Sequence, residues 1–253
     1  MLIMNGFTRT LYLARHHGSI FFRKIRAFPP LVVWVFALYL MYEQPPVNIV
    51  QGYLSTTMLQ FFIIAWFGYV FLSDIDIVTE HLQILQINCK LKYFASKIIF
   101  VTAICFGLSL IGSLAPVVIQ ILSSVFGTAS IYGGMTFLDF IGGLLLHFTV
   151  GCMGVALVFI FHPNTAKGND ATSLVVLILF AIFAFTKHQI FNLTGWLSYL
   201  LLIFTPAYEI MSLYTNHSSF LVRDMLLTAL FGSVYFTIAI VFAYTKKVYR
   251  PKT

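Results

Sequence analysis

The stretch FIGGLLLHFTVGCMGVALVFIF, residues 140–161, runs for 22 residues without an Asp, Glu, Lys or Arg. A helix needs ~20 mostly apolar residues to cross the hydrocarbon core of a bilayer, so this run is long enough. The rest of the chain is similar, because 60% of its 253 residues are hydrophobic and only 9% are charged. A soluble domain carries roughly 25% charged residues, and 27 Phe with 13 Tyr exclude a disordered chain. The sequence therefore predicts an integral membrane protein.

Five further runs lack charged residues and are expected to cross the membrane as well. Their apolar sequence is continuous rather than alternating, which favours helices over barrel strands and predicts an all-α protein. The six expected transmembrane helices are residues 28–42, 53–72, 98–125, 140–161, 171–186 and 225–245. Gly112, Ser113 and Pro116 interrupt the third, so a kink or a helix end is expected there. We expect residues 1–253 to form a single transmembrane domain.

The basic residues fall unequally on the two sides of this arrangement. Six spans place both termini on one side, and that side holds every Lys and Arg of the 15 except Lys187 and Arg223. Because cytoplasmic segments carry the excess of Lys and Arg, both termini are expected in the cytoplasm. The net charge of +7 is then a signal of topology, and no nucleic-acid partner is predicted.

Two segments outside the spans mix apolar and polar residues. Residues 7–26 combine several Phe with Arg and Lys, which favours a helix lying in the cytoplasmic interface over a solvated basic tail. Residues 188–222 face outward by the charge count and include the apolar run Leu193–Tyr208. A seventh full span there would move the basic C-terminus outside, so we expect a re-entrant or interfacial hairpin before the sixth span.

The segment 74–89, between the second and third spans, predicts a short amphipathic helix. Val78, Leu82, Leu85 and Cys89 recur at the spacing of one helical face, and Asp76 can cap the beginning of the helix. The apolar face could lie against the lipid or against the protein's own bundle. Alternatively, it could contact a cytoplasmic partner.

The sequence holds few residues that could carry chemistry. It contains no G-x-x-x-x-G-K-[ST] phosphate-binding loop, and its three cysteines have no metal-ligand spacing, so no catalytic residue, metal or cofactor is expected in this chain. Asp139, just before the fourth span, and His147, within it, stand out; they lie ~12 Å apart along one helix, too far for direct contact. They are candidate pathway residues or structural polar residues, and for His147 a neutral, hydrogen-bonded packing role is favoured over a proton relay.

The order of these parts resembles the permease subunit of an ABC exporter of the ABC-2 type. That family commonly has, after the second span, an acid, a Leu-rich helix and then a Lys leading into the third span. Glu80, Leu82, Leu85 and Lys97 stand at those places. The Pro that the family has between helix and Lys is missing here, and Asn88-Cys89 occupies its region. The aromatic residues and Pro of Trp196–Tyr208 match the family's outer hairpin.

The resemblance implies a function and partners. Residues 7–26 would be the elbow helix, and residues 74–89 the coupling helix that contacts a separate ATPase. The residues at this contact would be Asp76, Val78, Glu80, Leu82, Leu85 and Lys97. Two ATPase copies, which bind ATP and Mg, and a second permease chain, identical or sister, would complete an exporter of an amphipathic or hydrophobic substrate such as a peptide, bacteriocin or drug. Its place would be the bacterial plasma membrane.

Two other functions remain open from the residues. An ion-coupled secondary transporter would use Asp139 and His147 to carry charge across the membrane. An intramembrane enzyme would need the same two residues. A membrane scaffold would not turn over a substrate and would need neither residue. The absence of Asp, Glu, Lys and Arg from the other predicted spans counts against ion coupling.

Overall fold

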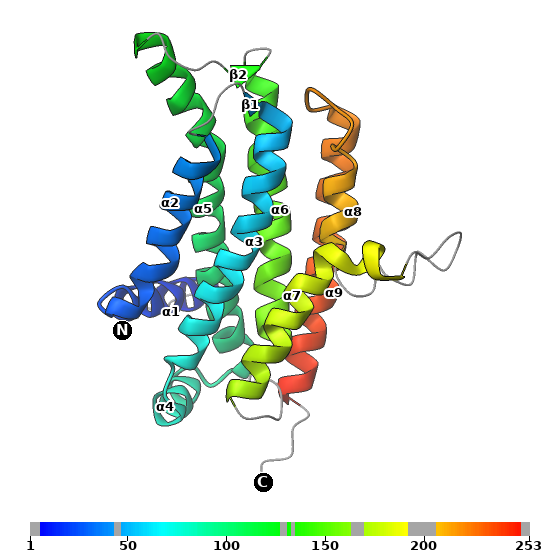
Figure 1. The fold of residues 1–253 in the computed structure, drawn as a ribbon. Coiled ribbons are helices and arrows are strands. Elements are labelled where there is room, and N and C mark those ends of the chain that lie inside the picture. The colour runs from blue at the N-terminus through cyan, green and yellow to red at the C-terminus, as the bar shows by residue number, and fades with distance from the viewer. Residues whose placement is uncertain are drawn as a thin grey trace.

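The computed structural model shows a bundle of helices (Figure 1). It describes residues 6–42, 47–126, 131–132, 135–162, 170–191 and 206–248. Within these residues the only strands are β1 (Val47–Asn48) and β2 (Ile131–Tyr132), which form one short parallel pair at the upper end of the bundle in Figure 1. The all-α class predicted from the uncharged runs is therefore confirmed.

Among the described residues, five helical segments are long and apolar enough to cross a membrane. They are Ile25–Tyr42, made of the 3-10 turn η1 (Ile25–Ala27) and α2 (Phe28–Tyr42), then α3 (Ile49–Ser73), α5 (Lys90–Phe126), α6 (Phe137–Phe161) and α9 (Val222–Val248). The predicted fifth span lies in α7 (Asp170–Phe191), whose apolar stretch Ala171–Thr186 is shorter. The chain thus has the architecture of a multi-pass membrane protein.

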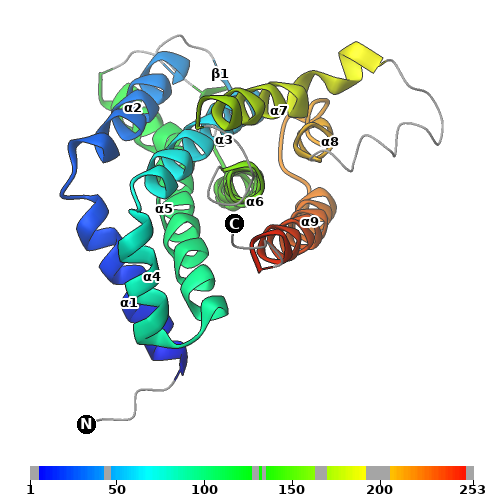
Figure 2. The same ribbon diagram turned by 90° about the horizontal axis from the view of Figure 1, so that it is seen from below.

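Consecutive long helices run in opposite directions through the bundle (Figure 1). Helix α7 rises from the lower end, where α6 ends, and α9 descends again. As a result, α1 (Gly6–Phe21) and the end of α9 both lie toward the lower end, which also carries α4 (Ile77–Ile87). Seen from below, α1 and α4 extend to one side of the bundle (Figure 2).

The third predicted span is longer than expected and does not end at its proline. Helix α5 begins at Lys90 rather than near residue 98, and it continues through Pro116 to Phe126. Pro116 lacks the backbone N–H that would bond to Gly112, but it removes only that one bond from the helix. A kink or a helix end was expected at this position, and the prediction of a helix end is wrong.

Helix α6 occupies the centre of the bundle, between α3, α5 and α9. Its glycines allow the close approach. A Cβ at Gly154 would lie 2.9 Å from the Phe61 carbonyl oxygen of α3, and one at Gly143 would lie 2.6 Å from the Tyr53 ring. Small residues at helix contacts let backbones come close in membrane bundles. Larger side chains at these two positions would push α3 and α6 apart.

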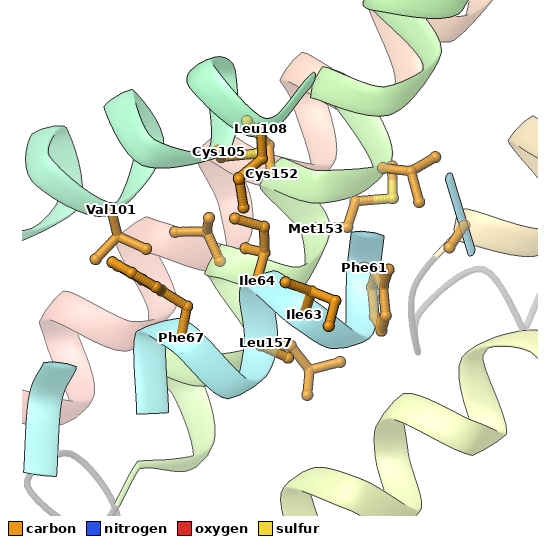
Figure 3. Close-up of a cluster of buried hydrophobic side chains, with 14 of the residues drawn as sticks. Phe61, Ile63, Ile64, Phe67, Val101, Cys105, Leu108, Cys152, Met153 and Leu157 are labelled. Carbon is orange, nitrogen blue, oxygen red and sulfur yellow. The ribbon is translucent and has the colours of Figure 1, made fainter. Parts of the chain in front are cut away.

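The core lies where α3, α5 and α6 meet (Figure 3). Phe61 and Ile64 of α3 pack there with Val101 of α5 and Met153 of α6, and all four are fully buried. Cys105 and Cys152 lie side by side in the same cluster as free thiols. Close packing of this kind, rather than water exclusion, is what holds helices together in a bilayer.

Part of the predicted outer hairpin, 188–222, is described. Residues 192–205 lie outside the described residues, whereas α8 (Ala207–Ser212) and the turns after it fold back on the bundle. The Gln51 side chain amide donates to the Thr215 carbonyl at 2.9 Å, and the Tyr214 and Thr228 hydroxyls lie 2.7 Å apart. These bonds attach the segment to the beginning of α3 and to α9.

Candidate functional site

Helix α4 has defined ends. The Asp76 side chain accepts hydrogen bonds from the backbone N–H groups of Val78 (3.1 Å) and Thr79 (3.2 Å), as its predicted capping role requires. At the other end Asn88 takes a left-handed conformation with φ of 53° and donates its N–H to the Ile84 carbonyl. Asparagine tolerates this conformation better than most residues. Only two residues, Asn88 and Cys89, then separate α4 from α5.

Three apolar residues of α4 face away from the rest of the described chain. Val78, Leu82 and Leu85 are 64%, 56% and 75% exposed, and we call these three residues the apolar stripe. The opposite side of the helix, with Glu80 buried and Ile84 half-buried, faces the bundle. The described part of the bundle is therefore not what the apolar stripe contacts, and the lipid and a cytoplasmic partner are the alternatives that are left.

A buried ion pair fixes α4 to α5. The Lys97 ammonium lies 3.2 Å from the Glu80 carboxylate and 4.4 Å from the centre of the Tyr93 ring. The side chains of Lys97 and Glu80 are only 2% and 11% exposed. Both were predicted to contact a partner directly. The structure instead places them inside the chain, where they hold the helix that presents the apolar stripe.

Helix α1 packs against the same region through His17. The His17 Nε2 atom lies 3.3 Å from the Ser96 hydroxyl, and the imidazole meets the rings of Phe71 and Tyr93 edge-on. Burial is the main cause that lowers the pKa of His17 to about 4. Electrostatic repulsion from Lys97 and His16 lowers this pKa further, and the Glu80 carboxylate opposes them.

A second ion pair connects the turn after α1 to the segment that leads into α4. Lys24, in the turn after α1, pairs with Asp74, which follows the last residue of α3. We call the two ion pairs and the His17–Ser96 contact the α1–α4–α5 joint. His17, Ser96, Lys24 and Asp74 were not among the candidate residues, because each pair is far apart in sequence and follows no helical spacing.

His147 lies fully buried in the middle of the bundle. Its Nδ1 atom is 2.7 Å from the Gly143 carbonyl, and its Nε2 atom is 2.9 Å from the Thr56 hydroxyl. A carbonyl can only accept, so Nδ1 carries the proton, and Nε2 faces the Thr56 hydroxyl, which also donates to the Gly52 carbonyl at 2.9 Å. The rings of Tyr53 and Trp34 enclose it edge-on. Both ring nitrogens of a neutral imidazole therefore lie within hydrogen-bond distance of groups of the protein itself.

Asp139 performs a local structural task at the upper end of α6. One carboxylate oxygen accepts from the backbone N–H and the hydroxyl of Thr136, completing a capping box. The other accepts from the Phe220 N–H at 3.2 Å and so anchors the segment before α9. Asp139 and His147 thus bond to separate groups, as their spacing along one helix predicts.

One hollow in the structure is mostly apolar. It lies between the upper parts of α5 and α6 and measures about 500 Å³. Its lining residues are Leu114, Val117, Gln120, Ile121, Met135, Thr136, Phe137 and Phe140. Ligand sites of 300–1,000 Å³ with few polar groups typically take apolar or amphipathic molecules.

The described residues contain no cluster of three or more His, Cys, Asp or Glu side chains that could hold a metal ion. The candidate site is a surface, namely the apolar stripe of α4 together with the α1–α4–α5 joint that supports it. No protein-family model matches this chain, and a comparison with well-characterised proteins finds none of significant sequence similarity.

Proposed function

We propose that this chain is the membrane-spanning subunit of an ATP-driven exporter of the ABC-2 type. In this proposal α7 crosses the membrane as the fifth of six spans, α1 is the elbow helix, and α4 is the coupling helix. Both termini face the cytoplasm of a bacterial cell. The observation that carries the proposal is the exposed apolar stripe, Val78, Leu82 and Leu85, on a short helix held by a buried ion pair.

An exposed apolar stripe on a rigid helix suits the groove of another protein. Amphipathic helices bind in grooves through residues at i, i+4 and i+7, which is the spacing of the stripe. Lipid is the weaker alternative, because α4 lies lower than α1, at the lower end of the bundle (Figure 1). The partner that fits is a cytoplasmic ATPase, since the sequence has no phosphate-binding loop of its own.

The α1–α4–α5 joint is the route by which, in this proposal, a movement of the ATPase would reach the membrane-spanning helices. Glu80 and Lys97 connect α4 to α5 through a buried ion pair, and the two-residue link at Asn88 leaves little slack. A displacement of α4 would therefore move α5, which enters the core beside α6. ATP and Mg would bind the two ATPase copies, and a second permease chain, identical or sister, would complete the pathway.

The proposed cargo is amphipathic or hydrophobic, such as a peptide, bacteriocin or drug. The apolar hollow between α5 and α6 supports this class of substrate. An ion-coupled carrier has less support, because Asp139 and His147 are both engaged in local hydrogen bonds. The same bonds argue against an intramembrane enzyme that uses these two residues.

The test is photo-crosslinking from the stripe combined with ATP hydrolysis. A photoreactive amino acid at Leu82 should crosslink a protein that carries a phosphate-binding loop, and the co-purified complex should hydrolyse ATP. With the photoreactive amino acid at Leu82, the added change Leu85→Asp should abolish both signals, and Leu82→Asp on its own should abolish ATP hydrolysis by the co-purified material. Leu91→Asp is the matched control, because Leu91 is also exposed but lies on α5. If the stripe variants keep full hydrolysis and crosslinking, α4 is not the coupling helix.

A further inference from the structure

Helix α1 has one face against the bundle and others that no part of the described chain covers. The buried face is formed at helical spacing by Thr10, Leu13, Ala14, His17 and Phe21. Phe7, Leu11 and Phe22 form a second stripe beside it, and their side chains are 70%, 42% and 38% exposed. The helical hydrogen bond from the Phe22 N–H to the Gly18 carbonyl keeps Phe22 in register with this stripe.

Contacts of α1 show which way this second stripe faces. Gly18 and Phe22 both meet Phe100, which lies almost three turns into α5 from its lower end. His17 and Lys24 instead line a cavity of about 250 Å³ with Asp76 and other residues near α4. The stripe therefore faces the side of the spans, where the hydrocarbon lies, and α4 lies on the opposite, water-facing side.

Four arginines surround these apolar residues. Arg9 and Arg15 lie on α1, Arg23 and Arg26 follow it, and all four are exposed. None of the ion pairs within the described residues involves them, whereas Lys24 pairs with Asp74. The sequence has no Asp or Glu before Glu43 that could neutralise them locally.

We infer that Arg9, Arg15, Arg23 and Arg26 bind the anionic phospholipid headgroups of the cytoplasmic leaflet. With Phe7, Leu11 and Phe22 in the acyl region, α1 holds these guanidinium groups at the level of the phosphates. A guanidinium group matches a phosphate with paired hydrogen bonds. Basic clusters on amphipathic helices are attracted to acidic lipid. The chain therefore prefers an acidic lipid surface to a zwitterionic one.

The experiment measures lipid retention by the full chain. The protein is incubated in neutral detergent with equal amounts of phosphatidylglycerol and phosphatidylcholine of identical acyl chains, and bound lipids are counted by native mass spectrometry. We expect phosphatidylglycerol to be preferred about tenfold or more. The preference should fall with added salt, because charge attraction is screened.

Variants identify the residues responsible. The quadruple replacement R9Q, R15Q, R23Q and R26Q should remove the preference, and the four Arg→Lys changes should keep most of it. Arg223→Gln, at the other end of the bundle, is the control and should have no effect. A wild-type preference near one, or a preference unchanged in the glutamine variant, would overturn the inference. Even if the glutamine variant folds poorly, the ratio of phosphatidylglycerol to phosphatidylcholine bound by the wild type, and the dependence of this ratio on salt, still test the inference.

Discussion

At the scale of single residues, His147 links two helices of the core. Its Nε2 atom lies 2.9 Å from the Thr56 hydroxyl of α3, and its Nδ1 atom donates to Gly143 within α6. His147→Ala would leave a cavity and remove both of these contacts, although the Thr56 hydroxyl keeps its bond to the Gly52 carbonyl. We expect a loss of about 2–4 kcal/mol in the free energy of unfolding, measured by thermal unfolding in detergent. His16→Ala, at an exposed position of α1, should cost almost nothing.

The same variant separates packing from proton transfer. If His147 only packs, the fraction of His147→Ala that folds should retain substrate transport with an unchanged pH profile. A proton relay would instead lose transport in a protein that remains well folded. The bonding of both ring nitrogens favours the first outcome.

His17 gives a pH dependence of stability with a defined sign. Its pKa falls from 6.5 in the unfolded chain to about 4 in the folded protein, chiefly through burial. The unfolded state therefore binds the proton first as the pH decreases, and stability is lost between about pH 6.5 and pH 4. The loss is on the order of 3 kcal/mol at the acid limit.

The measurement compares wild type with His17→Gln, which can still donate to Ser96. The difference in melting temperature between the two should shift in favour of the variant as the pH decreases from 7 to 4. Carboxylate effects are shared by both proteins and cancel in the difference. A difference that stays constant over this range would show that His17 is not buried as described.

At the scale of elements, the ion pair between α4 and α5 should control how firmly α4 is held. Lys97→Met leaves the Glu80 carboxylate buried without its cation, which costs about 3–5 kcal/mol in comparable pairs. We expect α4 to detach before the bundle unfolds, so hydrogen exchange of residues 77–87 should become much faster. The double replacement E80Q and K97M removes both charges and should restore much of the protection. Equal exchange in wild type and Lys97→Met would mean that the ion pair does not hold α4.

The helices could be predicted from the sequence better than their contacts. Uncharged runs located α2, α3, α6 and α9 to within a few residues, and Asp76 marked the beginning of α4. The beginning of α5 was placed too late, because Lys90 and Lys97 interrupt the uncharged run without interrupting the helix. Charge density reports which part of a helix is apolar, and it does not report where the backbone hydrogen bonds begin.

The candidate site was predicted only in part for the same kind of reason. Periodicity indicated that Val78, Leu82 and Leu85 share a face, but it could not show that Glu80 turns inward to Lys97. The Lys24–Asp74 pair joins residues 50 positions apart and leaves no local pattern. Contacts between distant segments depend on how the helices pack, which a single sequence does not encode in its spacing.

At the scale of the whole molecule, the bundle makes a prediction about sidedness. Leu85 is exposed at the lower end, and Leu221 is exposed just before α9, near the upper end. If α7 crosses the membrane, six crossings place Leu85 in the cytoplasm and Leu221 outside. Replacing Cys89, Cys105 and Cys152 by Ala or Ser provides a background for single cysteines at either site.

A membrane-impermeant maleimide should then label Leu85→Cys only in inverted vesicles and Leu221→Cys only in intact cells. The bond between Gln51 and Thr215 holds the segment before α9 against the outer end of α3, so Leu221 cannot reach the lower end without unfolding it. Labelling of both positions from the same side would exclude the crossing of α7. The proposed six-span arrangement would then fail. The proposed binding of anionic lipid by α1 would still be testable, because it depends on the leaflet that contains α1 and not on whether α7 crosses the membrane.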